Sequence, residues 1–144
     1  MMVVKQMADA GRLAYVDTSV LIAASGTEVL SEWALSALWG NTLVSSALAR
    51  VELARFAHRT GYGGQGLREM EARVSFVNVD DQAIAAAIAV SGEVKALDAI
   101  HVGTWARLYM VGVDCPFITA DRKQAAVAAG AGAQVLHPFG DDLA

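Results

Sequence analysis

The chain has 144 residues, and we expect one domain over residues 1–144 with its compact part at about 12–137. Apolar residues make up 55% of it, but no uninterrupted apolar stretch approaches the roughly 20 residues that cross a membrane, so we expect no membrane partner. The formal net charge of −4 argues against a broadly basic surface of the kind that binds nucleic acid.

Two further features concern the compartment. The single cysteine, Cys115, cannot form an internal disulfide, and residues 1–12 carry three charges without a long apolar run. We therefore expect neither a disulfide framework nor a secretory signal, which fits a reducing cytoplasm.

Short apolar runs alternate with helical patterns from residue 13 to residue 136. The runs predict strands at 13–16, 42–45, 76–79, 117–119 and 134–136. The helical patterns and their capping residues predict helices at 18–26, 27–40, 46–60, 65–74, 80–90, 97–109 and 122–130. This alternation indicates an α/β fold, a three-layer α/β/α sandwich with a mainly parallel central sheet.

Four carboxylates lie within or next to the elements of this predicted fold, namely Asp17, Glu52, Asp98 and Asp121. Two of them follow strands, one opens a helix, and one lies about two turns into a helix. Right-handed crossovers bring the carboxyl ends of parallel strands to one edge of the sheet, where all four can converge. Each has apolar neighbours, and an unpaired buried carboxylate costs several kcal/mol or takes up a proton. A shared divalent ion, Mg²⁺ or Mn²⁺ for hard oxygen ligands, is the simplest counter-charge.

Each carboxylate also has an ordinary interpretation as a helix cap or a surface charge. For Asp98 alone, capping explains the residue nearly as well as metal binding, and for Asp121 alone it is the better explanation. Capping does not explain Glu52 within a helix, so the set of four favours the metal site. We expect Asp17 and Asp98 to be the principal ligands. Glu52 and Asp121 would bind directly, bind through water, or orient the attacking water.

The same residues belong to four segments that resemble, in order, the motifs of PIN-domain nucleases. The segments are Val16-Asp17-Thr18-Ser19-Val20-Leu21-Ile22, Ser45-Ser46 followed by Glu52-Leu53, Leu97-Asp98-Ala99-Ile100-His101, and Ile118-Thr119-Ala120-Asp121-Arg122-Lys123-Gln124. Together they cover nearly the whole domain, from residue 16 to residue 124. Within that family, the single-domain length looks most like the VapC-type toxins of bacterial toxin–antitoxin pairs.

The resemblance implies a metal-dependent endoribonuclease in which Asp17, Glu52, Asp98 and Asp121 are catalytic and bind the metal, with Mg²⁺ as cofactor and Mn²⁺ as its substitute. It also implies an RNA substrate, a cognate antitoxin that masks the acidic edge, a homodimer and a cytoplasmic location. The strongest rival is a degenerate PIN-like domain that binds RNA or a protein without cleavage, and the four filled acidic positions argue against it.

Two other enzyme and signalling classes fit less well. An aspartyl phosphatase would need a second aspartate where Ser19 stands. A receiver domain phosphorylated at Asp80 would leave Glu52 and Asp98 unexplained.

Polar neighbours of the carboxylates are candidate supporting residues. Thr18, Ser19 and Thr119 are suited to hydrogen bonds with the carboxylates or a scissile phosphate, and equally to capping a helix or forming a turn. His101 lies three residues after Asp98 on the predicted helix and would orient that carboxylate. For His101 alone, a packed structural histidine is the favoured interpretation.

Arginines concentrate in residues 50–73, where five of them stand against three glutamates. They are Arg50, Arg55, Arg59, Arg68 and Arg73. As a group they would form a basic wall for an RNA backbone, although a solvated helix face is favoured for any single one. Trp39, near a helix end, is the surface candidate for stacking on a base, whereas Trp33, Trp105 and Cys115 are expected to be packed residues.

Overall fold

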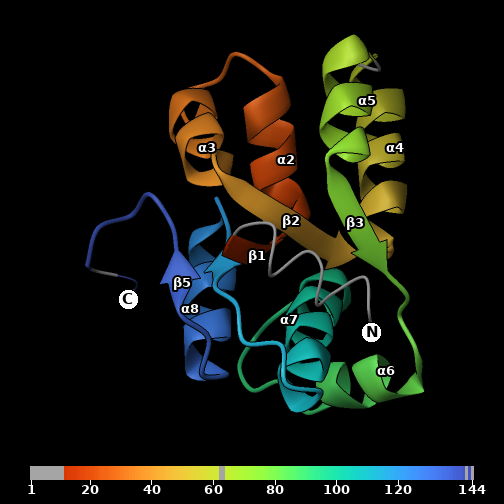
Figure 1. Ribbon diagram of the computed structural model, residues 1–144, viewed down its shortest axis with the longest axis vertical. Helices are drawn as coiled ribbons and strands as arrows, with labels where there is room; N and C mark the ends of the chain where they lie inside the picture. Colours follow the sequence, from red (N-terminus) through yellow and green to blue (C-terminus); the bar gives the residue numbers. More distant parts are fainter. Residues whose placement is uncertain (1–11, 62–63, 142, 144) are drawn as a thin grey trace.

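The computed structural model describes residues 12–61, 64–141 and 143, through which strands and helices alternate (Figure 1). The strands are β1 (Arg12–Val16), β2 (Asn41–Ser46), β3 (Val74–Val77), β4 (Phe117–Ile118) and β5 (Val135–Leu136). The helices are α2 (Thr18–Ser25), α3 (Ser31–Leu38), α4 (Leu48–Thr60), α5 (Gln65–Ala72), α6 (Asp81–Ile88), α7 (Ala96–Met110) and α8 (Arg122–Gly130). The predicted α/β fold is confirmed.

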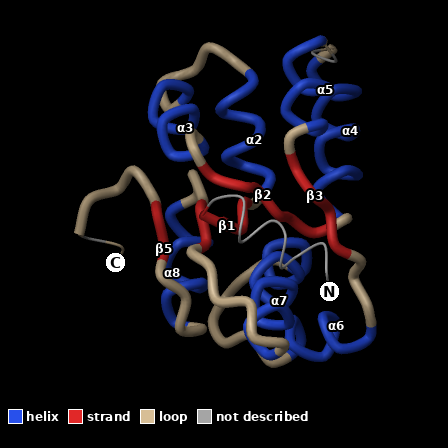
Figure 2. The backbone as a smooth tube through the Cα atoms, viewed as in Figure 1, coloured by secondary structure: helices blue, strands red, loops and turns tan. Residues whose placement is uncertain are grey.

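The strands form one sheet in the order β3-β2-β1-β4-β5, and every neighbouring pair is parallel (Figure 2). The sequence predicts a mainly parallel sheet, and over the described residues the sheet is wholly parallel. β1 is its central strand, and residues Ala14, Tyr15 and Val16 are fully buried. A strand covered on both faces reads as a continuous apolar run, which is why it can be recognised from the sequence.

Helices cover both faces of the sheet and complete the three-layer sandwich. α2, α3, α4 and α5 lie above it in Figure 1, and α6, α7 and α8 lie below. The side chains of β1 alternate between these layers: Ala14 and Val16 pack with α2 and α3, whereas Tyr15 packs with α7 and α8. One short strand therefore joins two hydrophobic cores.

The second helix begins later than predicted. α3 starts at Ser31 and not at residue 27, because residues 28–31 close a turn. In that turn the N–H of Glu28 donates to Ser31 Oγ, and the N–H of Ser31 donates to the Glu28 carbonyl. Val29 is 97% exposed there, so it does not belong to the apolar stripe of the helix.

The third strand lies two residues earlier than predicted. β3 occupies Val74–Val77 rather than 76–79, and α5 ends at Ala72. Pairing with β2 sets this position, since Val74 stands opposite Leu43. The shift places Val74 and Phe76 against the core formed by α2, α3 and α5.

The packed residues behave largely as predicted. Trp105 is buried and donates its indole N–H to the Cys115 carbonyl at 2.7 Å, and Cys115 is itself buried. Trp33 packs against the core, whereas Trp39 is 82% exposed at the end of α3. The packing expected for Trp33, Trp105 and Cys115 and the exposure expected for Trp39 are confirmed, and the stacking of Trp39 on a base stays a prediction.

Helices α6 and α7 are in very close contact at Gly103 of α7. A Cβ added to Gly103 would lie 2.6 Å from the Ala87 nitrogen and 2.8 Å from the Ala83 carbonyl oxygen. Only glycine allows the two helix backbones to approach so closely. Since α7 also carries Asp98 and His101, this contact helps to set where those two side chains stand.

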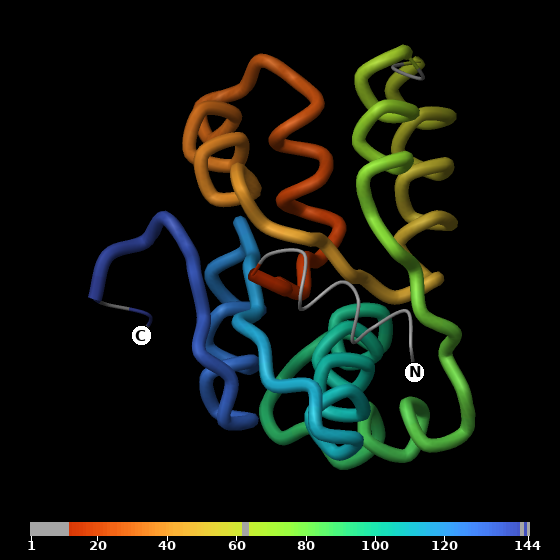
Figure 3. The backbone as a smooth tube through the Cα atoms, in the orientation of Figure 1, coloured from red at the N-terminus to blue at the C-terminus, as the bar shows by residue number. Residues whose placement is uncertain are grey.

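The direction in which successive strands are added to the sheet reverses next to β1. From β1 the chain adds β2 and β3 on one side, whereas β4 and β5 lie on the other (Figure 3). At this switch point the N–H of Asp17 donates to the Ile118 carbonyl at 3.1 Å, which ties the carboxyl ends of β1 and β4 together. Open α/β sheets bind ligands at such a point. Among the described helices, none has the length and apolar character needed to cross a bilayer.

Candidate active site

A pocket of about 380 Å³ opens at the carboxyl edge of the sheet, beside the switch point. All four predicted carboxylates line it. Asp17 comes from the end of β1, Glu52 from α4, Asp98 from the first turn of α7, and Asp121 from the start of α8. The structure thus brings together residues that are up to 104 positions apart in the chain (121 − 17 = 104). Their catalytic and metal-binding roles stay predictions.

Asp17 is the most buried of the four, with only 4% of its surface exposed. Its Oδ1 accepts a hydrogen bond from Ser19 Oγ at 2.5 Å, and its Oδ2 accepts one from Thr119 Oγ1 at 2.6 Å. Burial raises the pKa of Asp17 above its usual value, and the charge of His101 and these hydroxyl groups offset only part of that effect. A cation bound in the pocket would stabilise the charged form of this carboxylate.

Two supporting hydroxyls hold Asp17 in place through the backbone that follows β4. Ser19 Oγ accepts the N–H of Ala120 at 3.0 Å, and Thr119 Oγ1 accepts the N–H of Asp121 at 3.0 Å. Each hydroxyl therefore receives a backbone hydrogen and passes its own hydrogen to Asp17. This arrangement couples the position of Asp17 to that of Asp121.

Glu52 has a separate set of donors. Thr18 Oγ1 donates to Glu52 Oε1 at 2.7 Å, and His101 Nε2 lies 2.7 Å from the same oxygen. Burial by itself would raise the pKa of Glu52, but the His101 hydrogen bond and charge, with the Thr18 hydrogen bond, bring the pKa below its usual value. Glu52 is therefore a carboxylate with defined partners.

The favoured interpretation of His101 as a packed residue is confirmed, whereas the alternative, a contact with Asp98, is not what the structure shows. It is buried, with 1% of its surface exposed, as expected for a packed histidine. However, its hydrogen bonds go to Glu52, Thr18 and Tyr15, so the prediction that it orients Asp98 is wrong. The reason is that both ring nitrogens have partners on other elements: Nδ1 meets Tyr15 of β1, and Nε2 meets Thr18 of α2 and Glu52 of α4.

Asp98 and Asp121 lie nearer the opening. Partial burial raises the pKa of Asp98, and the negative charges of Asp121 and Glu52 raise it further. Asp121 caps α8, because its Oδ1 accepts the N–H of Gln124 at 3.0 Å. Asp121 thus does what a capping residue does while it also lines the pocket.

Gln124 and Tyr15 are two residues of the site that the sequence did not single out. Gln124 Nε2 donates to the backbone carbonyl of Asp98 at 3.0 Å, and its backbone N–H donates to the Asp121 carboxylate, so one residue links the start of α7 to the start of α8. Its spacing from Asp121 is that of a capping box, which is the signal that could have marked it. Tyr15 reads as an ordinary strand residue, and burial raises the pKa of its hydroxyl well above the usual value. No local pattern signals its contact with His101.

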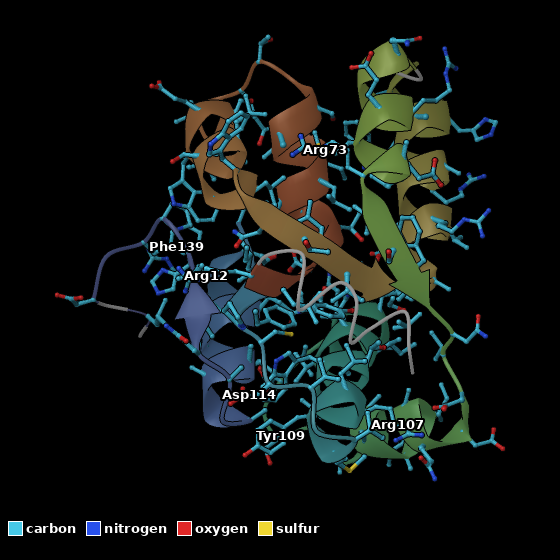
Figure 4. All side chains as sticks on the ribbon, in the orientation of Figure 1. Arg12, Arg73, Arg107, Tyr109, Asp114 and Phe139 are labelled. Carbon is cyan, nitrogen blue, oxygen red and sulfur yellow. The ribbon has the colours of Figure 1, made fainter. Side chains whose placement is uncertain are left out.

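Two of the five predicted arginines line the pocket. Arg55 and Arg59 come from α4 together with Val51 and Phe56, and the Arg59 guanidinium carbon lies 5.8 Å from the Phe56 ring centre. This side of the pocket is apolar and basic, whereas the side next to β1 is acidic. The remaining three arginines lie elsewhere on the described surface. Among these, Arg50 lies 3.6 Å from Glu71, and Arg73 follows α5 (Figure 4).

The donor chemistry fits a hydrated hard cation better than a closed metal cage. Over the described residues, no three His, Cys, Asp or Glu side chains gather closely enough to form a ready-made metal cluster. Mg²⁺ keeps several waters and is commonly held by one or two carboxylates with substrate phosphate, so it does not need such a cluster. Burial is the main cause of the raised pKa of Asp17 and of Asp98, and at Asp98 the negative charges of Asp121 and Glu52 add to it. A bound cation would offset both effects.

Comparison with known proteins settles the family. The family model named PIN domain matches residues 14–144. The chain belongs to the PIN domain family. The resemblance in the four acidic motifs is thereby confirmed at the level of the family.

Solved structures share the fold of this PIN domain. A toxin–antitoxin complex from Klebsiella pneumoniae matches with a TM-score of 0.64 and 24% identity, over 88% of this chain and 98% of that one. VapBC2 from Rickettsia felis, bound to a DNA fragment from its promoter, matches with a TM-score of 0.62 and 11% identity, over 87% of this chain and 98% of that one. No curated protein sequence matches.

Proposed function

We propose that this PIN domain is a metal-dependent endoribonuclease of the VapC type, acting as the toxin of a toxin–antitoxin pair. One observation carries the proposal. In a chain of the PIN family, four carboxylates from four different elements line one pocket at the switch point of the sheet. This is an arrangement suited to phosphodiester hydrolysis.

In the proposed site, Asp17 and Asp98 are the principal ligands of Mg²⁺, for which Mn²⁺ can substitute, and Glu52 and Asp121 complete the acidic set. When bound, the ion supplies charge stabilisation at the phosphoryl oxygens and a more acidic water. Ser19 and Thr119 fix both oxygens of Asp17, and Thr18 fixes Glu52.

The arginines of α4 supply positive charge on the other side of the same pocket. Arg55 and Arg59 line it together with the carboxylates and with the apolar side chains of Val51 and Phe56. In the proposed function they bind phosphates of the RNA next to the scissile one. A single-stranded substrate suits this pocket, because a duplex would hold its bases away from the apolar wall.

The proposed partners follow from the same likeness. Both solved structures described above are complexes of a toxin with its antitoxin. By analogy we infer a cognate antitoxin that covers the acidic pocket, a homodimer as the oligomeric state, and the cytoplasm as the place of action.

The test of cleavage uses purified protein and single-stranded RNA. Activity should disappear in EDTA and return with Mg²⁺ or Mn²⁺, and Asp98→Asn should be inactive under all conditions. Asp114→Asn is the matched control, because Asp114 precedes β4 and lies toward the amino edge of the sheet, away from the pocket (Figure 4). Cleavage that survives thorough chelation would contradict the metal mechanism.

The same experiment separates the proposal from its rival. RNA binding without cleavage at any concentration of Mg²⁺ or Mn²⁺ would favour a degenerate PIN-like domain. The toxin role has its own test: induced expression should arrest growth for the wild-type chain and Asp114→Asn, and not for Asp98→Asn.

A further inference from the structure

We propose that His101, held by Tyr15, is a positioning residue that fixes Glu52 with one oxygen occupied and the other presented to the pocket. The inference deepens the proposed function, since it concerns how the acidic site is prepared for its cation. It also assigns a hydrogen to one ring nitrogen of His101, Nε2.

The imidazole is held on several sides. Tyr15 from β1 and His101 from α7 are both buried, and the Tyr15 hydroxyl lies 2.8 Å from His101 Nδ1. Their rings meet edge to face at 5.9 Å, and Tyr15 in turn stacks on Phe117 at 5.1 Å. With this packing the ring of His101 has one position, and Nε2 points at Glu52 Oε1 from 2.7 Å.

The hydrogen bonds to Tyr15 decide which ring nitrogen of His101 carries the hydrogen. The N–H of Ser46 donates to the Tyr15 oxygen at 3.2 Å, so the hydroxyl hydrogen is free to be donated to Nδ1 of His101. The imidazole nitrogen is a more basic acceptor than the hydroxyl groups of Ser45 and Thr104 near the phenol. Nε2 then carries the hydrogen and donates it to Glu52.

The opposite tautomer is excluded by charge. With the hydrogen on Nδ1, the lone pair of Nε2 would face a carboxylate oxygen at 2.7 Å. The hydrogen of Thr18 is already donated to the same Glu52 oxygen, so it does not relieve this contact. The chain of donors therefore runs from Ser46 through Tyr15 and His101 to Glu52.

The result for Glu52 is an asymmetric carboxylate. Both hydrogen bonds that the described residues make to it end on Oε1, and Glu52 lines the pocket. Oε2 is thus left for a cation or its water. A glutamate is a flexible ligand, and holding it before the cation arrives removes an ordering cost from binding. Partners of this kind are what orient metal ligands in proteins.

The first test reads the tautomer in the wild-type, metal-free chain. Ring nitrogen shifts of ¹⁵N-labelled histidine, assigned by their loss in His101→Gln, should show hydrogen on Nε2. Hydrogen on Nδ1 with none on Nε2 overturns the proposal. This measurement requires no variant to be active and no metal to bind.

The second test uses two variants of similar size. His101→Gln keeps an N–H donor near the position of Nε2, whereas His101→Asn can reach only Tyr15. Mn²⁺ affinity is measured calorimetrically without RNA, next to the thermal unfolding midpoint. We expect similar midpoints for the two variants, an affinity near wild type for His101→Gln, and a loss of roughly 10- to 100-fold for His101→Asn.

Equal affinities for both variants and the wild type would make His101 a purely structural residue and would overturn the proposal. If the wild-type chain binds no Mn²⁺, the metal site of the proposed function fails instead. The tautomer then tests the Tyr15–His101–Glu52 arrangement by itself. The two failures are therefore distinguishable.

Discussion

At the scale of single residues, the site is organised by hydroxyl groups. Thr119 accepts the N–H of Asp121 and donates to Asp17, and Ser19 makes the matching pair of bonds from α2. These bonds fix both oxygens of the Asp17 carboxylate and hold the backbone of Asp121 beside it. Because burial raises the pKa of Asp17, the charged form of this carboxylate is unfavourable in the metal-free protein.

Replacing Asp17 tests whether it serves function rather than folding. In Asp17→Asn the buried charge is lost and the shape is kept, and one hydroxyl has only to turn to meet the amide. We expect the free energy of unfolding in EDTA, measured by urea titration, to stay unchanged or to rise. RNA cleavage should fall by more than about 100-fold, because one of the two proposed principal ligands is lost. A variant that unfolds would make Asp17 mainly structural, and one that cuts normally would remove it from the site.

Cys115 gives a prediction about pH. Burial raises the pKa of its thiol from 9.0 to about 11, and only 4% of its surface is exposed. A raised pKa means that the folded state favours the protonated thiol, so this contribution to stability is lost as the pH climbs from about 9 toward 11. A disulfide reagent at pH 8 should hardly react with the native chain and should react fully in denaturant. Fast reaction of the native protein at pH 8 would contradict the burial of this thiol.

At the scale of elements, two helices set most of the site. α7 supplies Asp98 and His101, and α4 supplies Glu52, Arg55 and Arg59. Each helix is held in position by its contacts with other elements, such as the contact between α6 and α7 at Gly103. The distances inside the pocket therefore depend on contacts that lie outside it.

Gly103→Ala tests the close contact between α6 and α7 that holds α7 in position. The added methyl group would lie 2.6 Å from the Ala87 nitrogen, and backbone cannot give way as a flexible side chain does. We expect a loss of stability of about 1–3 kcal/mol from overpacking, despite the better helix propensity of alanine. Gly130→Ala is the matched control, because a Cβ there meets nothing within 4 Å. It should be neutral or gain up to about 1 kcal/mol. Equal effects in urea unfolding would contradict the close contact.

The salt dependence of RNA binding tests whether the arginines of α4 contact RNA phosphates. In the double variant Arg55→Gln with Arg59→Gln, RNA binding should weaken for many sequences alike. The slope of log K against log salt should flatten by roughly 0.7 for each lost phosphate contact on a single strand. Metal affinity should change little, because these side chains are not ligands.

The control for the salt experiment removes the same charge elsewhere. Arg50→Gln with Arg73→Gln should leave the slope unchanged, since neither residue lines the pocket and the Arg50–Glu71 pair is exposed. Equal slopes for the two double variants would return Arg55 and Arg59 to the status of solvated helix face.

At the scale of the whole molecule, the sequence predicted the architecture because each layer leaves a local trace. Buried parallel strands read as apolar runs, and capped helices follow them, so Asp17 and Asp121 could be placed at strand ends. β3 was misplaced because its position depends on pairing with β2, which no local pattern contains. The domain boundary at about 12–137 stays a prediction, and residues 1–11 lie outside the described part of the chain.

The site residues that lie at strand ends and helix starts could be predicted from the sequence. The partner of His101 could not, because Asp98 is its neighbour on the helix whereas Glu52 is 49 residues away in the chain. The Tyr15 contact spans 86 residues and exists only because α7 packs against the sheet beside Tyr15. Long-range hydrogen bonds of this kind follow from tertiary packing, not from spacing.

Metal binding should stabilise the whole fold. A cation that binds only the folded state adds about 2.7 kcal/mol of stability at a hundred times its dissociation constant. The midpoint of thermal unfolding should therefore rise with Mn²⁺ for the wild-type chain and Asp114→Asn, and much less for Asp98→Asn. An equal rise in all three proteins would mean that Mn²⁺ binds outside the pocket.

The winding of the sheet also has a consequence for biosynthesis. Thr119, which donates a hydrogen bond to Asp17, is added by the ribosome 102 residues after Asp17. At roughly 5–20 residues per second, that delay is about 5–20 s. Until then the central strand lacks one of its two neighbours, and the pocket lacks Asp121. The nascent chain therefore lacks a complete acidic pocket until Asp121 has been added. In the proposed function, this chain cannot cut the messenger from which it is being translated before that point.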